Sequence, residues 1–229
     1  MTRIDPKEKR STSPLIHAFY ASPMTGQEIE ERSFEMIDRE APPHRFMPEE
    51  WEVVRRMIHA TGDFTLMDAV RFSPDAIHAA VEALLGGRPI YVDSNMIRSG
   101  LSLARLQSVN EDYRRESIVC YVADKGVSRQ AREANLPRSL FAVRKAASIL
   151  GGGIAVFGNS PIALLELNRM IIEEDIRPSF VIAMPVGFVH VIESKQELIS
   201  LGLPYIAVVG RRGGSPLAVS VIHALCSLA

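Results

Sequence analysis

One histidine near the end of a predicted helix has surroundings that suit acid–base chemistry. His59 follows Arg56 by three residues, so the two side chains project from one face of a helix that ends at Thr61-Gly62. A helix C-terminus favours the protonated imidazole, whereas a neighbouring arginine disfavours it. Imidazole titrates near neutral pH, so the residue type suits a proton donor. A purely structural histidine is the alternative interpretation, and the spacing alone leaves it open.

A glycine-rich segment with two arginines is the second feature that could do chemistry. Gly210-Arg211-Arg212-Gly213-Gly214-Ser215 lies between a predicted strand and a predicted helix. Backbone N–H groups and the helix dipole at such a turn favour an anion, and the arginines add positive charge. The segment matches neither a P-loop nor a dinucleotide fingerprint. It therefore predicts a site for a carboxylate or a phosphate, with a tight turn and solvated arginines as the alternative.

The other motifs are less specific. The remaining histidines form neither an HxH nor an HExxH pattern, so we predict no metal site. His190 follows a predicted strand and is the second acid–base candidate, whereas His223 lies among apolar neighbours and is interpreted as a packed helix residue. No GxSxG motif for a nucleophilic serine occurs. Gly158-Asn159-Ser160-Pro161 indicates the capped start of a helix.

Strands and helices that alternate along the chain must position these residues. Short apolar runs predict five strands, at 89–92, 118–122, 154–157, 180–184 and 205–209. Helices are predicted at 27–37, 48–61, 73–85, 130–134, 138–150, 161–173, 194–200 and 216–228. This alternation predicts an α/β fold, a doubly wound parallel sheet with helices on both faces and a helical N-terminal extension. Ligands bind at the carboxyl ends of the strands in such folds, which is where the glycine-rich segment lies.

Composition and charge exclude several classes of protein. The chain has 229 residues, of which 47% are hydrophobic and 23% charged, as in an ordinary globular protein. The 26 basic and 27 acidic residues balance, which argues against a nucleic-acid coat or a polybasic membrane binder. Two cysteines and a polar N-terminus predict a cytoplasmic protein without a secretion signal or a membrane span. We expect residues 1–14 to form a flexible tail and residues 15–229 a single domain.

Residues 56–64, Arg-Met-Ile-His-Ala-Thr-Gly-Asp-Phe, resemble the signature of the precorrin-8X methylmutase family. Further blocks resemble the family in the same order along nearly the whole chain, from about residue 23 to residue 228. These blocks are residues 29–34, 93–96 with Gly100, 120–124, 158–161 with 163–164, 185–189 with 193–195, and 210–215. Several blocks in order make the resemblance far more specific than a single motif.

The resemblance implies an activity. The family moves a methyl group from C-11 to C-12 of precorrin-8 or cobalt-precorrin-8, a corrinoid tetrapyrrole, and gives hydrogenobyrinate or cobyrinate in the biosynthesis of cobalamin, vitamin B12. It also implies a flavodoxin-like fold, a homodimer and no added cofactor. Both substrate forms stay open, although the blocks at 95–96, 120–124 and 189–195 resemble the cobalt-bearing branch more.

The resemblance assigns the catalytic role to His59 and substrate contacts to Ser33, Arg56 and Arg138. The strand-end loops add further candidates for substrate binding: Asn95, Asn159, Arg211, Gly213 and Ser215. The sequence departs from the family pattern at Pro137, Ile162 and His190, which puts the neighbouring substrate contacts in question.

The expected substrate agrees with the residues. It carries many carboxylates around a wide apolar ring, so a site needs arginines and helix N-termini around an apolar floor. A methyl migration needs a proton donor and neither a nucleophile nor a redox centre. Two alternatives come from other classes: a carrier that binds a tetrapyrrole or another anionic ligand without catalysis, and a flavin or nucleotide protein of flavodoxin-like fold.

Overall fold

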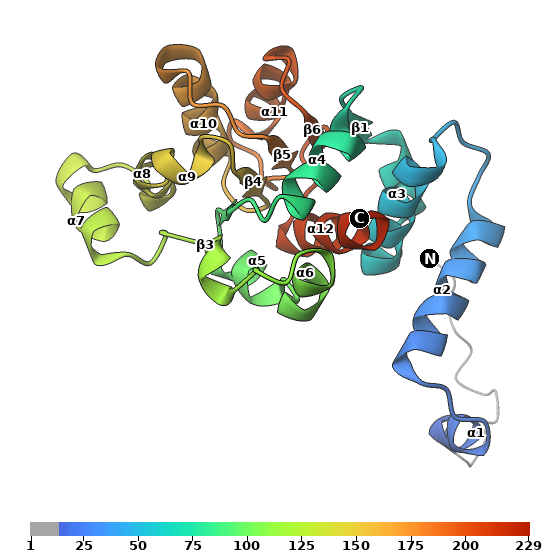
Figure 1. Ribbon diagram of the computed structural model, residues 1–229. Coiled ribbons are helices and arrows are strands. Elements are labelled where there is room, and N and C mark those ends of the chain that lie inside the picture. Colours follow the sequence, from blue (N-terminus) through green and yellow to red (C-terminus); the bar gives the residue numbers. More distant parts are fainter. Residues whose placement is uncertain (1–13) are drawn as a thin grey trace, which may run out of the picture. The chain divides into compact units, whose positions relative to one another are not determined.

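The structure, a computed structural model, describes residues 14–229 (Figure 1). The chain divides into two units, residues 1–40 and residues 41–229. In the first unit, α1 (Ile16–Ala21) and α2 (Gly26–Glu40) contain no buried residue, and α2 confirms the helix predicted at 27–37. The flexible tail expected at 1–14 falls almost entirely outside the described residues, and the single domain at 15–229 stays a prediction.

A six-stranded sheet forms the centre of the second unit. Its strands are β1 (Val70–Phe72), β2 (Ile90–Val92), β3 (Ile118–Val119), β4 (Ile154–Phe157), β5 (Phe180–Ala183) and β6 (Tyr205–Val208). Their order is β1-β6-β5-β4-β2-β3, and only β1 runs antiparallel to its neighbour. The five parallel strands have the flavodoxin-like order, in which the winding direction reverses between β2 and β4. The predicted fold class is therefore confirmed, with one more strand than expected.

Helices cover both faces of the sheet because its strands are apolar on both sides. On one face, Tyr91, Phe157 and Val181 pack with side chains of α10 (Pro161–Glu174) and α11 (Val191–Ser200) in one buried cluster. On the other face, α12 (Ser215–Leu228) contacts β4 and β5 and also packs against α3 (Pro48–Thr61) and α4 (Ala76–Leu85). Figure 1 shows α12 and α3 side by side. None of the described helices is both long enough and apolar enough to cross a membrane.

Several predicted helix boundaries differ from the structure for local reasons. The helix predicted at 138–150 is two helices, α8 (Arg138–Lys145) and α9 (Ala147–Leu150). The helix predicted from residue 130 begins at Lys125, because the Asp124 side chain accepts a hydrogen bond from the Val127 N–H; this is α7 (Lys125–Ala134). Ser73 does not cap α4: its hydroxyl oxygen accepts from the Tyr205 N–H at 2.9 Å, and α4 begins at Ala76.

The sequence prediction also omitted several short helices and turns. These are α1, α5 (Asn95–Gly100), α6 (Leu103–Val109) and the two 3₁₀ turns, η1 (Phe64–Asp68) and η2 (Arg115–Ser117).

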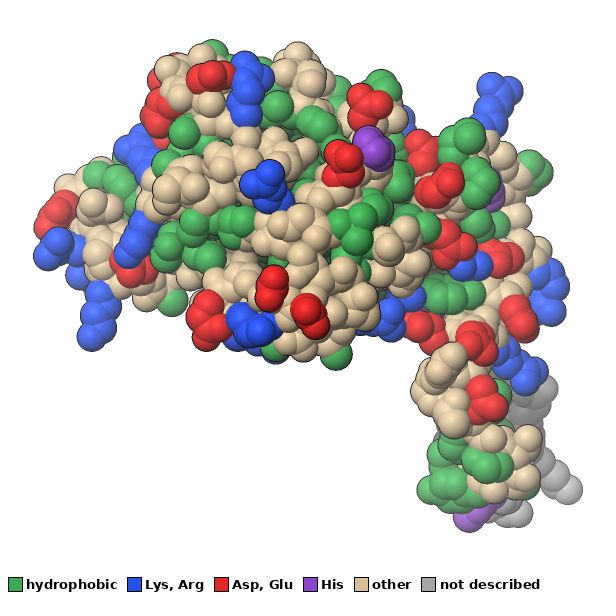
Figure 2. Space-filling view, in the orientation of Figure 1, with side chains coloured by type: hydrophobic (Ala, Val, Ile, Leu, Met, Phe, Trp, Pro, Cys, Tyr) green, Lys and Arg blue, Asp and Glu red, His purple; other side chains and the backbone are tan. Residues whose placement is uncertain are grey.

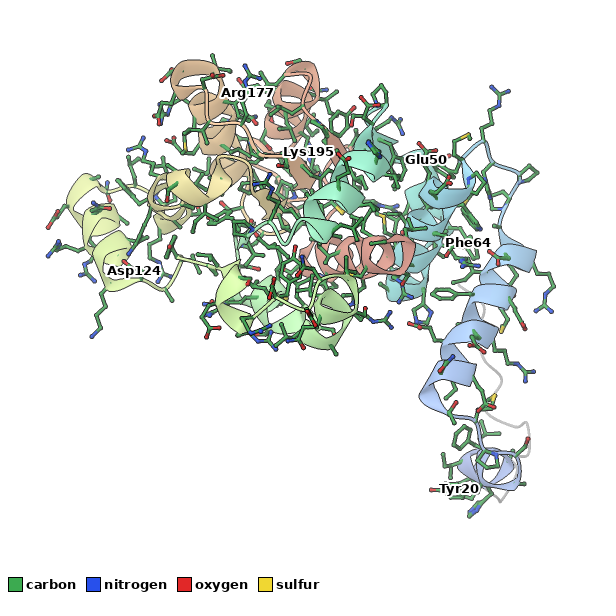
Figure 3. The ribbon with its side chains drawn as sticks, in the orientation of Figure 1. Tyr20, Glu50, Phe64, Asp124, Arg177 and Lys195 are labelled. Atoms are coloured by element: carbon green, nitrogen blue, oxygen red, sulfur yellow. The ribbon has the colours of Figure 1, made fainter. Side chains whose placement is uncertain are left out.

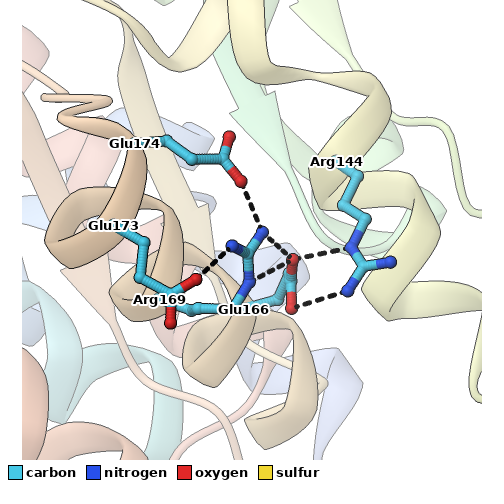
Figure 4. Close-up of polar contacts among 5 residues, drawn as sticks. All are labelled: Arg144, Glu166, Arg169, Glu173 and Glu174. Atoms are coloured by element: carbon cyan, nitrogen blue, oxygen red, sulfur yellow. Dashed lines mark hydrogen bonds and ion pairs between the residues drawn. The ribbon is translucent and has the colours of Figure 1, made fainter.

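A charged network ties α8 to α10 (Figure 4). The buried carboxylate of Glu166 accepts from Arg144 Nε of α8 at 2.7 Å and from Arg169 Nη2 at 2.7 Å. Arg169 also donates to Glu173 and Glu174. On the face shown in Figure 2, acidic and basic side chains are interspersed.

Candidate active site

A cavity of about 350 Å³ lies between the last turn of α3, the helix α5 and the first half of α12. Its lining residues are Arg56, His59, Ala60, Met96, Gly100, Ser215, Pro216, Val219, Ser220 and His223. Because α5 follows β2 and α12 begins just beyond β6, the cavity adjoins the carboxyl ends of the parallel strands. Arg56 and His59 thus meet in one cavity, as their spacing on a single helix face predicts.

The ends of α3 determine where His59 lies. Pro48 is the first helical residue, and the Glu50 side chain accepts a hydrogen bond from the Met47 N–H at 3.0 Å. At the other end Gly62 adopts a left-handed conformation, with φ of 65°, and donates its N–H to the Ile58 carbonyl at 2.7 Å. The helix therefore ends at Thr61, two residues after His59, and the His59 side chain is exposed in its last turn.

Burial of one face of α3 presents the other face to the cavity. Val53, Val54, Met57 and Ile58 are at most 1% exposed and anchor the helix. Arg56 is half-buried and His59 is exposed. An arginine and an imidazole next to each other in a mostly apolar cavity can bind a carboxylate and transfer a proton.

The start of α12 forms the opposite wall and depends on close backbone contacts. A Cβ atom at Gly213 would lie 2.1 Å from the Met184 carbonyl oxygen, so only glycine fits there. The Gly214 N–H donates to the same carbonyl at 2.8 Å. Ser215 is buried, and its Oγ lies 2.9 Å from Oγ of Ser94, the residue that caps α5. The two serines join the N-termini of the helices on either side of the cavity.

The structure places most of the other predicted site residues outside this cavity. Asn95 is exposed at the first residue of α5, next to Met96 of the cavity. Arg211 and Gly213 line a neighbouring cavity at the end of α3. Arg138, the first residue of α8, is exposed in a third cavity together with Ser128 and Arg132. Ser33 belongs to the first unit, where its hydroxyl donates to the Ile29 carbonyl at 2.7 Å, and its substrate contact stays a prediction.

The loop that carries Asn159 already holds a carboxylate of the protein itself. The N–H groups of Gly158, Asn159 and Ser160 all donate to the buried Asp93 side chain, at 3.1, 2.8 and 2.7 Å. Burial raises the pKa of Asp93, although these three donors oppose the effect. The backbone at this strand end is therefore satisfied, and only the exposed side chain of Asn159 remains for a ligand.

Seven lining residues were not predicted as site residues: Ala60, Met96, Gly100, Pro216, Val219, Ser220 and His223. Met96 and Gly100 belong to a helix that the sequence prediction omitted. Gly100 lets α5 approach closely, since a Cβ there would lie 3.0 Å from a methyl carbon of Val219. His223 is half-buried, as predicted for a packed helix residue, but it also lines the cavity, and its Nε2 accepts from the Ser102 N–H at 3.0 Å. The spacing of residues 216, 219, 220 and 223 on one helix face was the available signal. His190, the second acid–base candidate, is exposed at the start of α11 and does not line this cavity.

Comparisons with known proteins agree on one family. The model of the precorrin-8X methylmutase family matches residues 28–228. Cobalt-precorrin-8 methylmutase of Leptospira interrogans is 42% identical over 212 residues, covering 89% of this chain and 94% of that protein. Precorrin-8X methylmutase of Sinorhizobium is 36% identical over 202 residues, covering 87% and 93%. The crystal structure of precorrin-8X methylmutase from Thermus thermophilus superposes with a TM-score of 0.81 at 42% identity, over 89% of this chain and 96% of that chain.

Proposed function

The chain belongs to the precorrin-8X methylmutase family, and we propose that His59 is the acid in the isomerisation that it catalyses. The reaction moves a methyl group from C-11 to C-12 of precorrin-8 or cobalt-precorrin-8 and gives hydrogenobyrinate or cobyrinate, a step of cobalamin biosynthesis. The observation that carries the assignment is the position of His59, exposed beside Arg56 in a largely apolar cavity. The names of the relatives give no support to the alternative of a carrier without catalysis.

The chemistry is an internal rearrangement of the substrate. The bond from the methyl carbon to C-11 breaks as the bond to C-12 forms, so atoms and electrons stay within the substrate. His59 donates a proton to a ring nitrogen, which makes that ring electron-poor and lowers the barrier to migration. The proton returns to His59 after the shift, and the enzyme is ready for another cycle.

Other residues of the cavity bind and orient the ring. Met96, Pro216 and Val219 supply apolar walls for the flat macrocycle. The guanidinium of Arg56 donates to a peripheral carboxylate of the substrate and fixes the ring against His59. Asn95 and Ser215 bind polar groups at the N-termini of α5 and α12.

A homodimer accounts for candidate substrate-binding residues that lie outside the cavity of His59. A corrin with its carboxylate arms is larger than a cavity of about 350 Å³, so other surfaces must cover part of it. Arg138 lies in a different cavity of the same chain, and a second subunit can bring it to the substrate. C₂ dimers are the commonest soluble oligomers. We place the enzyme in the cytoplasm, because a reducing compartment suits its two free cysteines, Cys120 and Cys226.

Replacement of His59 tests the catalytic assignment. We expect His59→Ala to lower kcat by about 10²–10⁴-fold, the usual contribution of a general acid, while the affinity for the corrin product changes little. Turnover is followed by the absorbance change of the chromophore, with both substrate forms. His78→Ala on the surface of α4 is the matched control and should keep the wild-type rate. A His59→Ala enzyme with near wild-type kcat would disprove the assignment and direct attention to His190.

Mixing two impaired variants, at a substrate concentration low enough that Arg138→Ala chains alone turn over little, tests whether subunits share a site. If Arg138 of one subunit serves His59 of the other, a mixture of His59→Ala and Arg138→Ala chains regains activity in its hybrid dimers. Random pairing makes half of the dimers hybrid, each with one intact site, so about a quarter of the wild-type activity should return. The pair His59→Ala and Ser33→Leu tests Ser33 in the same way. No recovery would place both residues of a pair in one chain, and a monomer by light scattering would refute the dimer.

A further inference from the structure

A second cavity, of about 330 Å³, begins where α3 ends. Its walls come from the turn Thr61–Asp63, from the loop after β5 with Val186 and Phe188, and from Arg211 and Arg212 after β6. Thr61 is two residues from His59, and Leu217 of the second cavity follows Pro216 of the first. The two cavities therefore adjoin across the end of α3 and the start of α12.

Arg212 is held at the mouth of this cavity by a contact that a ligand can replace. Its Nη2 lies 3.0 Å from Asp63 Oδ2, and its Nη1 donates to Thr65 Oγ1. The side chain of Arg212 is half exposed, as is common for an exchangeable ion pair. Hydrogen bonds from the Thr65 hydroxyl and N–H lower the pKa of Asp63, with a smaller contribution from Arg212. Asp63 thus stays ionised without Arg212, so the guanidinium can move to another carboxylate without a proton transfer.

An exposed aromatic side chain lies next to the second arginine. Phe188 is 84% exposed, and the guanidinium carbon of Arg211 is 5.7 Å from its ring centroid. The loops that carry the two residues are joined by a hydrogen bond from the Gly187 N–H to the Arg211 carbonyl at 3.3 Å. This wall combines apolar surface with positive charge, which suits a ligand that is apolar in its body and anionic at its end.

The buried side chain of Lys195 holds the loop that carries Arg211 and Arg212 through hydrogen bonds to its backbone. Lys195 of α11 is 1% exposed and points into the interior of the second unit (Figure 3). Its Nζ donates to the Gly210 carbonyl at 3.0 Å and to the Arg212 carbonyl at 2.6 Å. Two arginines and one carboxylate, that of Asp63, line the cavity, and the ammonium of Lys195 adds positive charge next to the backbone of the arginine-bearing loop. The excess of positive charge selects an acidic ligand.

We propose that this second cavity binds a carboxylate arm of the corrin substrate while the ring that undergoes methyl migration lies against His59. The substrate carboxylate replaces Asp63 as the partner of Arg212, and Phe188 packs on the apolar part of the arm or on the edge of the macrocycle. Asp63 then contributes to specificity, because a ligand must compete with its carboxylate for Arg212. Only a ligand with a stronger or better placed anion displaces it. This inference rests on the proposed function, since it takes the corrin as the ligand.

Affinity for the reaction product tests the inference separately from catalysis. Hydrogenobyrinate or cobyrinate is titrated into the wild-type enzyme and its variants, and binding is read from the absorbance bands. Arg212→Gln should weaken binding by about 10-fold or more, the usual loss of a charge-assisted hydrogen bond. Asp63→Asn should strengthen binding, because it frees Arg212 while the amide oxygen can still accept from Thr65. Arg177→Gln, at an exposed pair with Asp175, is the matched control and should change nothing.

The esterified product gives the decisive comparison. With the carboxylates masked, Arg212→Gln and Asp63→Asn should both bind like the wild type. Wild-type affinity of Arg212→Gln for the free acid, or an effect of equal size on the ester, would overturn the inference. So would an unchanged or weaker affinity of Asp63→Asn. Since His59 is tested by kcat and this cavity by product affinity, either proposal can fail while the other stands.

Discussion

Lys195 gives the sharpest quantitative test of the structure. It is a buried ammonium whose two hydrogen bonds both go to backbone carbonyls, those of Gly210 and Arg212. Replacement by Met keeps the length and the apolar stem of the side chain and removes its charge. Two partly buried backbone carbonyls then lose a donor, at a cost of up to about 1–3 kcal/mol each, but the cost of burying a charge disappears as well.

The pH dependence of that cost follows from the pKa of the lysine. Burial lowers the pKa of Lys195 from 10.5 to about 8. At 1.36 kcal/mol for a tenfold change in the ionisation equilibrium, keeping the folded state charged costs about 3 kcal/mol below pH 8. Between about pH 8 and 10.5 the unfolded chain binds more protons at this position than the folded one, so the free energy of unfolding rises with pH. The wild type should therefore gain about 3 kcal/mol relative to Lys195→Met across this window.

Urea unfolding at intervals from pH 7 to pH 10.5 measures the effect. The difference between the two proteins isolates Lys195, because the other titrating groups are common to both. Lys125→Met at the exposed start of α7 is the matched control and should follow the wild type at every pH. A difference that stays constant through the window would refute the assignment of a buried charge without a carboxylate partner. A difference that changes in the opposite direction would show that the lysine is paired with an anion.

Three further changes test the scaffold and the charge contacts. Gly213→Ala places a Cβ 2.1 Å from the Met184 carbonyl oxygen and should lower both the melting temperature and turnover. Gly151→Ala is the control and should lower neither, because its Cβ would lie 3.8 Å from the Ala147 carbonyl oxygen. Glu166→Gln removes the charge that Arg144 and Arg169 share and should cost about 1–3 kcal/mol in urea unfolding; an unchanged unfolding midpoint would contradict the network. Arg56→Ala and Arg138→Ala should each weaken product binding by about 10-fold or more, and equal affinity of the wild type for free and esterified product would contradict a carboxylate contact.

The strands were predictable where side chains alone specify them. β4 and β5 are continuous apolar runs buried on both faces, a pattern that needs no knowledge of neighbours. β1 is different: it has three residues, one of them Arg71, and owes its conformation to pairing with β6. The same is true of α5, which has six residues and a cap shared through Ser94 with the start of α12. Elements that depend on a partner distant in sequence leave no periodic signal of their own.

The candidate site was predictable to the same extent. Arg56 and His59 share a helix, so their spacing and a family signature bring them together before any fold is known. Met96 and His223 meet them only because α12 packs against both α3 and α5, and sequence spacing does not reveal such packing. Arg138 was assigned by resemblance alone, and it lies in another cavity of the chain than His59.

The position of the site along the sheet follows from one buried carboxylate. Folds of this strand order bind anionic ligands where the winding reverses, here between the ends of β2 and β4. Asp93 lies at this point, and its carboxylate accepts hydrogen bonds from the N–H groups of residues 158–160. These N–H groups would otherwise be available to a phosphate. A carboxylate of the chain therefore fills the site that a nucleotide or flavin phosphate would use. The anion site that we propose lies instead beyond β6, at Arg211 and Arg212, in the cavity that begins where α3 ends. The acid that we propose, His59, thus lies on a helix that precedes the first parallel strand of the sheet.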